Sequence, residues 1–547
     1  MTRIFEELLK KRGVNHDFLN PKYRVDLAEK LPDIEVATNR IAEAIAKQET
    51  VLVYGDYDVD GVTASTLMYD CLRLSGIKNV SVMLPDRFID GYGMGERVVG
   101  RAEELGATLI ITVDCGSNNA EVIDKLKARG VDVIVTDHHE IMKEIPKGAI
   151  AVVNPKRDER SEIRELCGCG VAFLVMQKMV NLGYIPEGRE KWYLDLVLIG
   201  TLCDSMTIDS VNRMLSFYGM KVLKKTRRPG LIELIKASKA NKINSETIGF
   251  QLGPRLNAGG RMESAEISLK LLMAENHQDA NKLAMKLNEL NLARRESQKK
   301  AISEIAVTED DVIVVAGEWH EGVLGIIAGR LVEKYHKPAF VLSEVGKGIL
   351  KGSGRSFGEF NLAEALKACE NVIIGGGGHA AACGVKVETQ RLDDFRKKVN
   401  EYYASLGLIE QEKYLEPQAD IKLEDFSELN LALMDEIKSL EPFGNGNLEP
   451  IFQLVDVKIV RVNKMGAEGQ HLRLDVADAS EKQIKLVAFN APEEWLNLVV
   501  GERGDIWINL VENEWQGNRS VEGRILSPLL KKCSVSGIIS AYGNQSN

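Results

Sequence analysis

The sequence predicts an α/β protein that has two α/β lobes followed by a small β-barrel. Apolar strand-like runs alternate with helical patterns over the first 205 residues, which is typical of a doubly wound parallel sheet. A second alternation of this kind begins at Asp311. Short alternating strands between residues 451 and 526 are typical of a barrel. A chain of 547 residues is expected to hold roughly three or four domains.

The composition predicts a soluble globular protein of the cytoplasm. Hydrophobic residues make up 44% of the chain, charged residues make up 27%, and the formal net charge is −10. Because the chain as a whole is acidic, a nucleic-acid partner would have to bind in a local basic cleft. The eight cysteines include no CxxC pair, and the N-terminus shows no secretory signal, so reduced thiols are expected. No run approaches the ~18 apolar residues of a membrane span.

The first lobe is organised around the stretch Val51 to Gly61. Its apolar start predicts a buried strand, and a helical pattern follows over 62–74. Between them, three aspartates stand at alternate positions: Asp56, Asp58 and Asp60. Three carboxylates this close remain ionised together only if cations or hydrogen-bond donors compensate their charge. The stretch therefore predicts a multi-metal site, with an acidic turn as the alternative.

Three later strands also end in polar residues. Because the carboxyl ends of parallel strands meet at one edge of a sheet, their side chains are expected to face one crevice. These residues are, in chain order, Arg87 and Tyr92, then Asp114, then Asp137-His138-His139. Imidazole together with carboxylate suits Mn²⁺ and other transition metals, and carboxylates alone also suit Mg²⁺. Arg87 could hold a phosphate and Tyr92 could stack on a base, although a surface salt bridge explains Arg87 equally well.

A further aspartate ends an apolar helix. The run from Leu196 to Cys203 is almost entirely apolar, and Asp204 follows it directly. An aspartate buried there without a partner would be costly, so Asp204 is a candidate metal ligand. A helix C-terminal turn is the alternative.

Four motifs in this order resemble those of the DHH phosphoesterase superfamily. They are Gly55-Asp-Tyr-Asp-Val-Asp-Gly61, Val113-Asp-Cys-Gly116, Asp137-His-His139 and Asp204. Two later stretches, Gly253-Pro-Arg-Leu-Asn-Ala-Gly-Gly-Arg-Met262 and Gly375-Gly-Gly-Gly-His379, are similar to signatures of its RecJ branch. The members of that branch are single-strand-specific 5′→3′ DNA exonucleases of bacteria. The resemblance covers nearly the whole chain.

The resemblance implies an order of domains. They are a helical segment over 1–49, a DHH catalytic domain over 50–264, a long connecting helix over 265–308, a DHHA1 substrate-binding domain over 309–410, an OB-fold over 411–530 and a flexible tail over 531–547. The implied activity is hydrolysis of single-stranded DNA from its 5′ end to 5′-mononucleotides, in DNA repair and recombination.

Two divalent ions, Mn²⁺ or Mg²⁺, are the implied cofactors. The implied ligands are Asp56, Asp58, Asp60, Asp114, His138 and Asp204. His139 would lie beside the scissile phosphate, and it forms the implied catalytic group with Asp114 and Asp137. Ions roughly 3.5–4 Å apart would activate a water for in-line attack on the phosphorus. Relatives often begin the first motif with histidine. The aspartates found here agree with the RecJ branch, and they leave open how Asp56 and Asp58 share the metals.

Residues of the later motifs are candidates for DNA binding. Arg255, Asn257 and Arg261 stand among glycines, which would let backbone amides approach an anion while the arginines grip it. A structured turn with solvated arginines is the alternative. The resemblance adds Ser353, Arg355 and His379 for the DNA backbone or the 5′ phosphate. The glycines before His379 suit a place where the backbone and a phosphate nearly touch.

The helix expected over 277–306 would join the two lobes and leave a groove between them. Its basic residues, Arg294, Arg295, Lys299 and Lys300, are interpreted as a solvated face. Single-stranded DNA is the implied partner of a monomer. The resemblance adds a single-strand-binding protein and a RecQ-type helicase as partners to be tested.

Two other functions are compatible with the motifs. One is a DHH hydrolase for short oligonucleotides, cyclic dinucleotides or pyrophosphate, but the predicted barrel favours a polymeric substrate. The other is a non-catalytic nucleic-acid-binding relative. Every expected ligand position is filled, which counts against a protein that has lost its metals.

Overall fold

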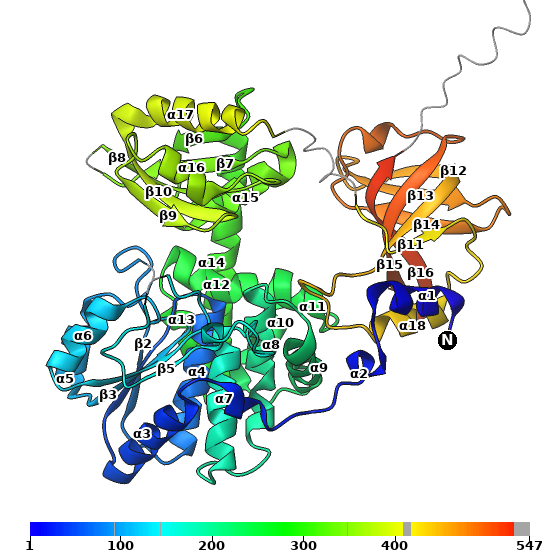
Figure 1. The fold of residues 1–547 in the computed structure, drawn as a ribbon. Helices are drawn as coiled ribbons and strands as arrows, with labels where there is room; N and C mark the ends of the chain where they lie inside the picture. Colours follow the sequence, from blue (N-terminus) through cyan, green and yellow to red (C-terminus); the bar gives the residue numbers. More distant parts are fainter. Residues whose placement is uncertain (92, 143, 347, 409–416, 530–547) are drawn as a thin grey trace, which may run out of the picture. The chain divides into compact units, whose positions relative to one another are not determined.

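The computed structural model describes residues 1–91, 93–142, 144–346, 348–408 and 417–529, so Tyr92 and the tail expected over 531–547 lie outside the described residues. The chain forms two compact units. The larger contains residues 22–411 and 444–446, and the smaller contains residues 1–21, 412–443 and 447–547. Figure 1 shows the ribbon of both.

A five-stranded parallel sheet forms the centre of the larger unit, with strand order β2-β1-β3-β4-β5. The strands are β1 (Val51–Tyr54), β2 (Val80–Met83), β3 (Leu109–Val113), β4 (Asp132–Thr136) and β5 (Ala151–Val153). In the register, Val53 lies between Val82 of β2 and Ile111 of β3. The chain moves to one side of β1 for β2 and to the other side for β3, and such a switch point is where open α/β sheets bind ligands.

Helices cover both faces of this sheet because alternate residues of each strand point to opposite layers. Val51 and Val53 pack in a core with α3 (Ile34–Lys47), α4 (Val59–Leu74) and α7 (Gly168–Asn181). Leu52 and Tyr54 pack with α5 (Arg97–Leu105) and α6 (Ala120–Ala128). The remaining helices of this lobe are η1 (Leu27–Lys30), η2 (Pro155–Arg157), η3 (Glu190–Tyr193), α8 (Leu194–Cys203), α9 (Ser210–Leu223), α10 (Pro229–Ser238), α11 (Ser245–Thr247), η4 (Ile248–Leu252), α12 (Gly253–Met262) and α13 (Glu266–Leu272).

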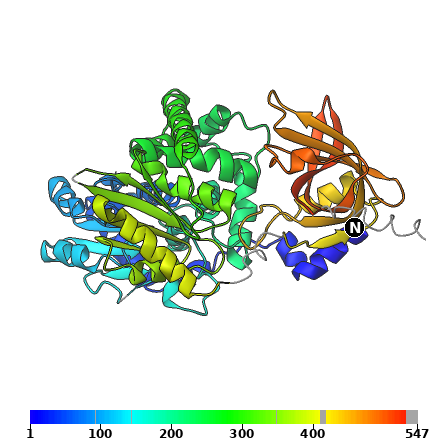
Figure 2. The same cartoon turned by 90° about the horizontal axis from the view of Figure 1, so that it is seen from above.

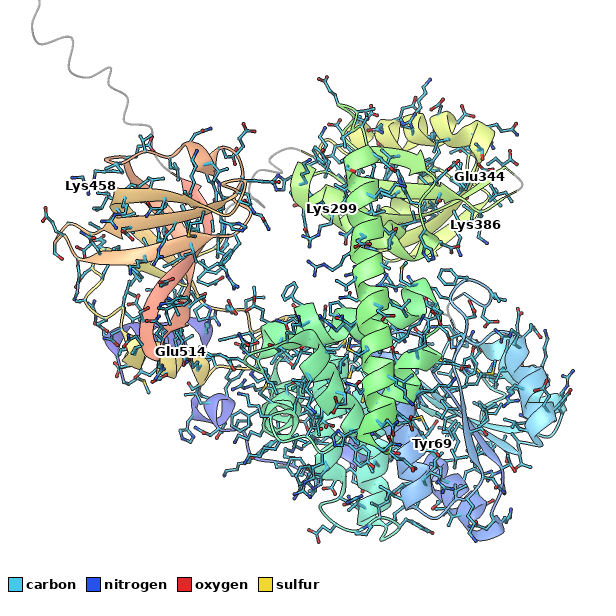
Figure 3. All side chains as sticks on the ribbon, turned by 180° about the vertical axis from the view of Figure 1, so that it is seen from behind. Tyr69, Lys299, Glu344, Lys386, Lys458 and Glu514 are labelled. Atoms are coloured by element: carbon cyan, nitrogen blue, oxygen red, sulfur yellow. The ribbon has the colours of Figure 1, made fainter. Side chains whose placement is uncertain are left out.

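The 28-residue helix α14 (His277–Glu304) is shared by the two lobes of the larger unit, and Figure 3 follows it along its length. Ala284 and Leu287 lie in the core of the first lobe, and Ala301 lies in the core of the second. The range 265–308, expected as one connecting helix, contains two helices, α13 and α14. The break has a local cause, because the side chain of Asn276 accepts a hydrogen bond from the backbone N–H of Asp279 and starts a new helix.

The second lobe is built on a mixed sheet with strand order β6-β7-β8-β10-β9. The strands are β6 (Ile313–Gly317), β7 (Ala339–Glu344), β8 (Ile349–Arg355), β9 (Gly375–Gly378) and β10 (Ala382–Glu388). Its helices are η5 (Glu321–Val323), α15 (Leu324–Tyr335), α16 (Leu362–Ala368), η6 (Thr389–Arg391) and α17 (Leu392–Ser405). Helix α15 packs on one face, and α16 and α17 pack on the other. In Figure 2, which looks from above, α17 crosses the sheet.

The smaller unit is a β-barrel. Its strand order is β11-β12-β13-β14-β16-β15, and a pairing of β12 with β15 closes it. The strands are β11 (Ile421–Leu423), β12 (Ile451–Met465), β13 (His471–Ala477), β14 (Gln483–Ala488), β15 (Arg503–Trp515) and β16 (Asn518–Leu529), with helices α1 (Arg3–Arg12), α2 (His16–Leu19), α18 (Leu431–Lys438) and η8 (Trp495–Asn497). Strand β12 is one long strand with register shifts.

The segment expected as an N-terminal helical domain over 1–49 is divided between the two units. Residues 1–21 belong to the barrel unit, and residues 22–49 belong to the larger one. The reason is packing, because Phe5 and Leu8 on the apolar side of α1 are buried in the barrel core. In the part of the chain that the structure describes, no helix has the length and hydropathy needed to cross a membrane.

Candidate metal centre and phosphate site

The first motif turns tightly from β1 into α4. The carboxylate of Asp58 accepts a hydrogen bond from the backbone N–H of Gly61 at 3.0 Å and so caps α4. A Cβ on Gly61 would lie 2.5 Å from the carbonyl oxygen of Asp56, so the turn requires glycine there. Asp60 accepts hydrogen bonds from Gly168 at 2.6 Å and Cys169 at 2.9 Å. These amides begin α7, whose positive end favours a carboxylate.

Asp137 holds His139 instead of facing the crevice. Its carboxylate accepts hydrogen bonds from the backbone N–H of Ser117 at 2.9 Å and of His138 at 2.7 Å, and it lies 2.8 Å from Nδ1 of His139. Burial raises the pKa of Asp137, but the hydrogen bond and charge of His139 prevail and lower it to about 2. Burial lowers the pKa of His139, but Asp137 prevails and raises it to about 9. His139 is therefore a cation at neutral pH.

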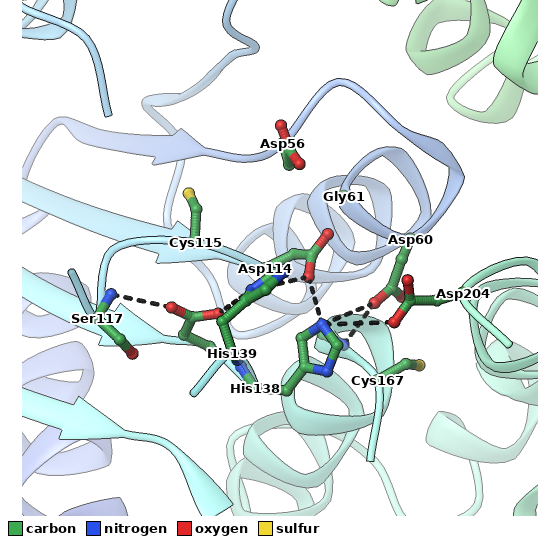
Figure 4. Close-up of polar contacts among 12 residues, drawn as sticks. Asp56, Asp60, Gly61, Asp114, Cys115, Ser117, His138, His139, Cys167 and Asp204 are labelled. Carbon is green, nitrogen blue, oxygen red and sulfur yellow. Dashed lines mark hydrogen bonds and ion pairs between the residues drawn. The ribbon is translucent and has the colours of Figure 1, made fainter. Parts of the chain in front are cut away.

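His138 lies among the carboxylates of Asp60, Asp114 and Asp204, as Figure 4 shows. Its Nε2 is 3.0 Å from Asp114 Oδ1, 3.6 Å from Asp204 Oδ2 and 3.8 Å from Asp60 Oδ2. Both Nε2 of His138 and Oδ1 of Asp114 are buried without a hydrogen-bond partner. Burial, followed by the charge of His139, lowers the pKa of His138 to about 3, so its imidazole is neutral and can bind a metal ion.

The six predicted ligands form two groups, each with ligand atoms within 4.8 Å of one another: Asp60, His138 and Asp204, and Asp56, Asp58 and Asp114. Burial and then mutual repulsion raise the pKa of Asp56 and of Asp204 to about 8, and the pKa of Asp60 to about 6. The cationic groups of the protein therefore do not offset the negative charge of these carboxylates. The two unpartnered buried atoms and the oxygen-rich donor set therefore fit a pair of divalent cations.

Four arginines gather beside this crevice and are called the arginine cluster: Arg87, Arg261, Arg294 and Arg355. Burial and then the charges of the other three lower the pKa of Arg261 to about 9. Arg261 donates to the carbonyl of Gly322 in the second lobe at 3.3 Å, and the guanidinium of Arg87 lies 5.0 Å from the ring centre of Tyr57. Among the described residues, no carboxylate forms an ion pair with any of the four.

Arg294 was expected to lie on a solvated face, but in the structure it is half-buried. Its spacing explains the difference. Arg294 follows the buried residues Leu287 and Asn291 by seven and three positions, so it shares their face of α14. This register is the signal that would have identified it.

The stretch around Arg255 forms a helix, α12, and not the structured turn given as the alternative. Its backbone amides are used within the helix, and its glycines serve packing: a Cβ on Gly260 would lie 2.9 Å from the carbonyl of Tyr57. Arg255 donates to Asn288 at 3.0 Å and to the carbonyl of Gln251 at 2.9 Å. Asn257 is half-buried on the same helix.

In the second lobe, Ser353 and Arg355 lie on the face of β8 opposite its buried residues, and Arg355 donates to Ser353 at 2.9 Å. The four glycines form the edge strand β9, paired with β10, and His379 is exposed where they join. A Cβ on Gly375 or Gly377 would meet only open space, so this edge remains accessible to another backbone.

Three family models match the chain. The N-terminal domain of the DHH family matches residues 50–201, the DHHA1 domain matches 309–405, and the RecJ OB domain matches 419–527.

Curated relatives match over most of the chain. The single-stranded-DNA-specific exonuclease RecJ of Bacillus subtilis is 36% identical over 88% of this chain. The chain spans 62% of that protein, but 80% of its Haemophilus influenzae counterpart, to which it is 32% identical. The crystal structure of RecJ from Thermus thermophilus in complex with Mn²⁺ superposes with a TM-score of 0.82 at 27% identity, covering 96% of this chain and 76% of that one. These matches show that the chain belongs to the RecJ family, within the DHH superfamily.

Proposed function

We propose that this protein is a metal-dependent exonuclease that degrades single-stranded DNA from its 5′ end to 5′-mononucleotides. The observation that carries the proposal is the convergence of buried carboxylates on the unpartnered Nε2 of His138, beside the arginine cluster. The names of the relatives, single-stranded-DNA-specific exonucleases, support the substrate.

The two ligand groups would hold two divalent ions. Asp60, His138 and Asp204 are assigned to one ion, and Asp56, Asp58 and Asp114 to the other. When bound, such ions supply a strong nucleophile from water at neutral pH and offset the charge that builds on the phosphoryl oxygens. Structures of RecJ with Mn²⁺ and with Mg²⁺ support this choice of cofactor.

His139 would act as a hydrogen-bond donor to the scissile phosphate. Asp137 keeps it protonated at neutral pH and fixes its Nδ1, so Nε2 is left to donate to a non-bridging oxygen. Donation strengthens as negative charge develops on that oxygen, which stabilises the transition state more than the ground state. In this mechanism no side chain forms a covalent bond to the substrate.

The arginine cluster would bind the terminal 5′ phosphate. Four guanidinium groups without ion-pairing carboxylates form a site for a doubly charged anion. Arg261 is buried, so solvent compensates its charge less than it does for an exposed arginine. A terminal phosphate held there sets the scissile bond one nucleotide away, which explains both the 5′ polarity and the mononucleotide product.

Family membership supports the cellular setting that we propose. The enzyme would work in the cytoplasm as a monomer in DNA repair and recombination, with a single-strand-binding protein and a RecQ-type helicase as partners. We propose the domain bounds 50–264, 309–410 and 411–530 for the DHH, DHHA1 and OB domains, and the three family models fall inside them.

The decisive experiment follows digestion of a 5′-phosphorylated single strand in Mn²⁺, with the products separated by length. We expect mononucleotides from the first time point, a shortening that starts at the 5′ end, and little cutting of a blunt duplex. A cyclic dinucleotide serves as the competing substrate, and faster hydrolysis of it would favour the small-substrate function.

A further inference from the structure

Among the described residues of the first lobe, Phe250 is the most exposed large hydrophobic side chain, and it belongs to neither hydrophobic core of that lobe. It is 78% exposed, although phenylalanine is usually buried. It lies on η4, a π-helical turn between α11 and α12. A π-helical turn is rare and is found frequently at functional sites. A Cβ on its neighbour Gly249 would have no atom within 4 Å, so this turn is open at that position as well.

Helix α12 begins just after Phe250, close to Asp204, and ends at the arginine cluster. At the start of α12, a Cβ on Gly253 would lie 2.6 Å from the sulfur of Cys203, the residue before Asp204. At its end, Arg261 lies in the arginine cluster. From Phe250 to Arg261 the helical path is about 16 Å at ~1.5 Å per residue, which is longer than one nucleotide.

Positive charge lies on the helix that directly follows Phe250 in the chain. The guanidinium of Arg255 donates to the carbonyl of Gln251, the residue after Phe250, and the charge of Arg295 acts on Arg255. Arg295 is exposed, and among the described residues no carboxylate pairs with it. An exposed aromatic ring with an arginine on the following helix can bind a single strand, because the ring stacks on a base while the arginine holds a phosphate.

We propose that Phe250 is a base-stacking subsite for the DNA strand on the 3′ side of the scissile phosphate, with Arg255 and Arg295 holding the adjoining phosphates. The inference rests on the proposed function. The side follows from α12: the 5′ phosphate lies at its arginine end, so the rest of the strand leaves past Asp204 towards Phe250. Stacking accepts every base, so the subsite would hold the strand without selecting a sequence.

The test combines the variant Phe250→Ala with a series of 5′-phosphorylated strands that carry one abasic nucleotide each, at successive positions from the 5′ end. For the unaltered enzyme, one internal position is expected to raise KM about tenfold. Phe250→Ala should raise KM about tenfold on the intact strand and no longer respond to that position. Phe250→Trp, which keeps a stacking face, should retain the response.

Controls separate this subsite from the proposed function and from folding. Val36→Ala removes an apolar side chain that is 48% exposed on α3, and KM should not change. The melting temperature of Phe250→Ala should equal that of the unaltered enzyme, because the ring buries little area. If the unaltered enzyme digests the intact strand but no abasic position depends on Phe250, the subsite is refuted and the exonuclease stands. If the unaltered enzyme digests no strand, both the subsite and the proposed exonuclease function are refuted.

Discussion

The pairing of Asp137 with His139 can be tested by Asp137→Asn, which removes the charge and keeps the shape. His139 has an ordinary pKa of 6.5, and its pKa here is about 9, although burial alone would lower it. The difference corresponds to about 3 kcal/mol in favour of the cation, at ~1.36 kcal/mol per pKa unit. Its side chain is 31% exposed, so solvent screening reduces this figure. Without Asp137, the pKa of His139 should fall towards 6.5, because burial lowers it while the charges of Asp204 and Asp56 still raise it.

Two measurements check this expectation. Titration of His139 by nuclear magnetic resonance, in metal-free protein, should show the fall in pKa directly. In the Mn²⁺ assay at pH 8, kcat of Asp137→Asn should fall at least tenfold, because neutral His139 donates more weakly. Part of that loss should be recovered at pH 6, where His139 is again protonated. A pKa above 8 for His139 in the variant would refute the pairing as its cause.

Three further predictions concern the metal centre and the arginine cluster. Asp114→Asn should abolish turnover and spare strand binding. Asparagine is chosen because it tolerates the positive φ of 60° at this position. An equal loss of strand binding in a gel-shift assay would show that Asp114 has a structural role. Because the pKa values of Asp56, Asp60 and Asp204 are raised, the folded metal-free protein binds more protons than the unfolded chain, and its stability should fall as pH rises from 5 towards 8. Mn²⁺ at about 100 times its Kd should restore ~2.7 kcal/mol at pH 8, and chemical denaturation with and without a chelator measures both effects. Arg261→Gln should remove the preference for a 5′-phosphorylated over a 5′-hydroxyl strand. The control variant Lys300→Gln, on the exposed part of α14, should keep that preference. An unchanged preference in Arg261→Gln would exclude the arginine cluster as the phosphate site.

The sequence predicted most of the fold because the strands of the first lobe are short apolar runs followed by polar residues. The apolar run Val51 to Val53, followed by the helical pattern over 62–74, predicted β1 and most of α4 without any contact information. The motif order also predicted which candidate metal ligands come together, because parallel strands bring their carboxyl ends to one edge.

The errors share a physical cause, which is that composition does not show what lies next to a residue in space. The glycines of α12 were expected to let backbone amides approach an anion, but they permit close packing against Tyr57. The helix over 1–21 could not be assigned to the barrel from local pattern, since its apolar face is completed by residues over 400 positions away, such as Ile437. Arg294 was assigned to solvent for the same reason.

The continuity of α14 fixes the length of the chain between the two lobes. Because both ends of this helix are anchored in separate cores, one residue inserted near Arg295 would turn everything beyond it by about 100° and advance it by about 1.5 Å. Arg355 would then leave Arg261, while each lobe would still fold. Insertions and deletions in α14 should therefore be tolerated far less than substitutions on its surface, although no candidate metal ligand lies on this helix.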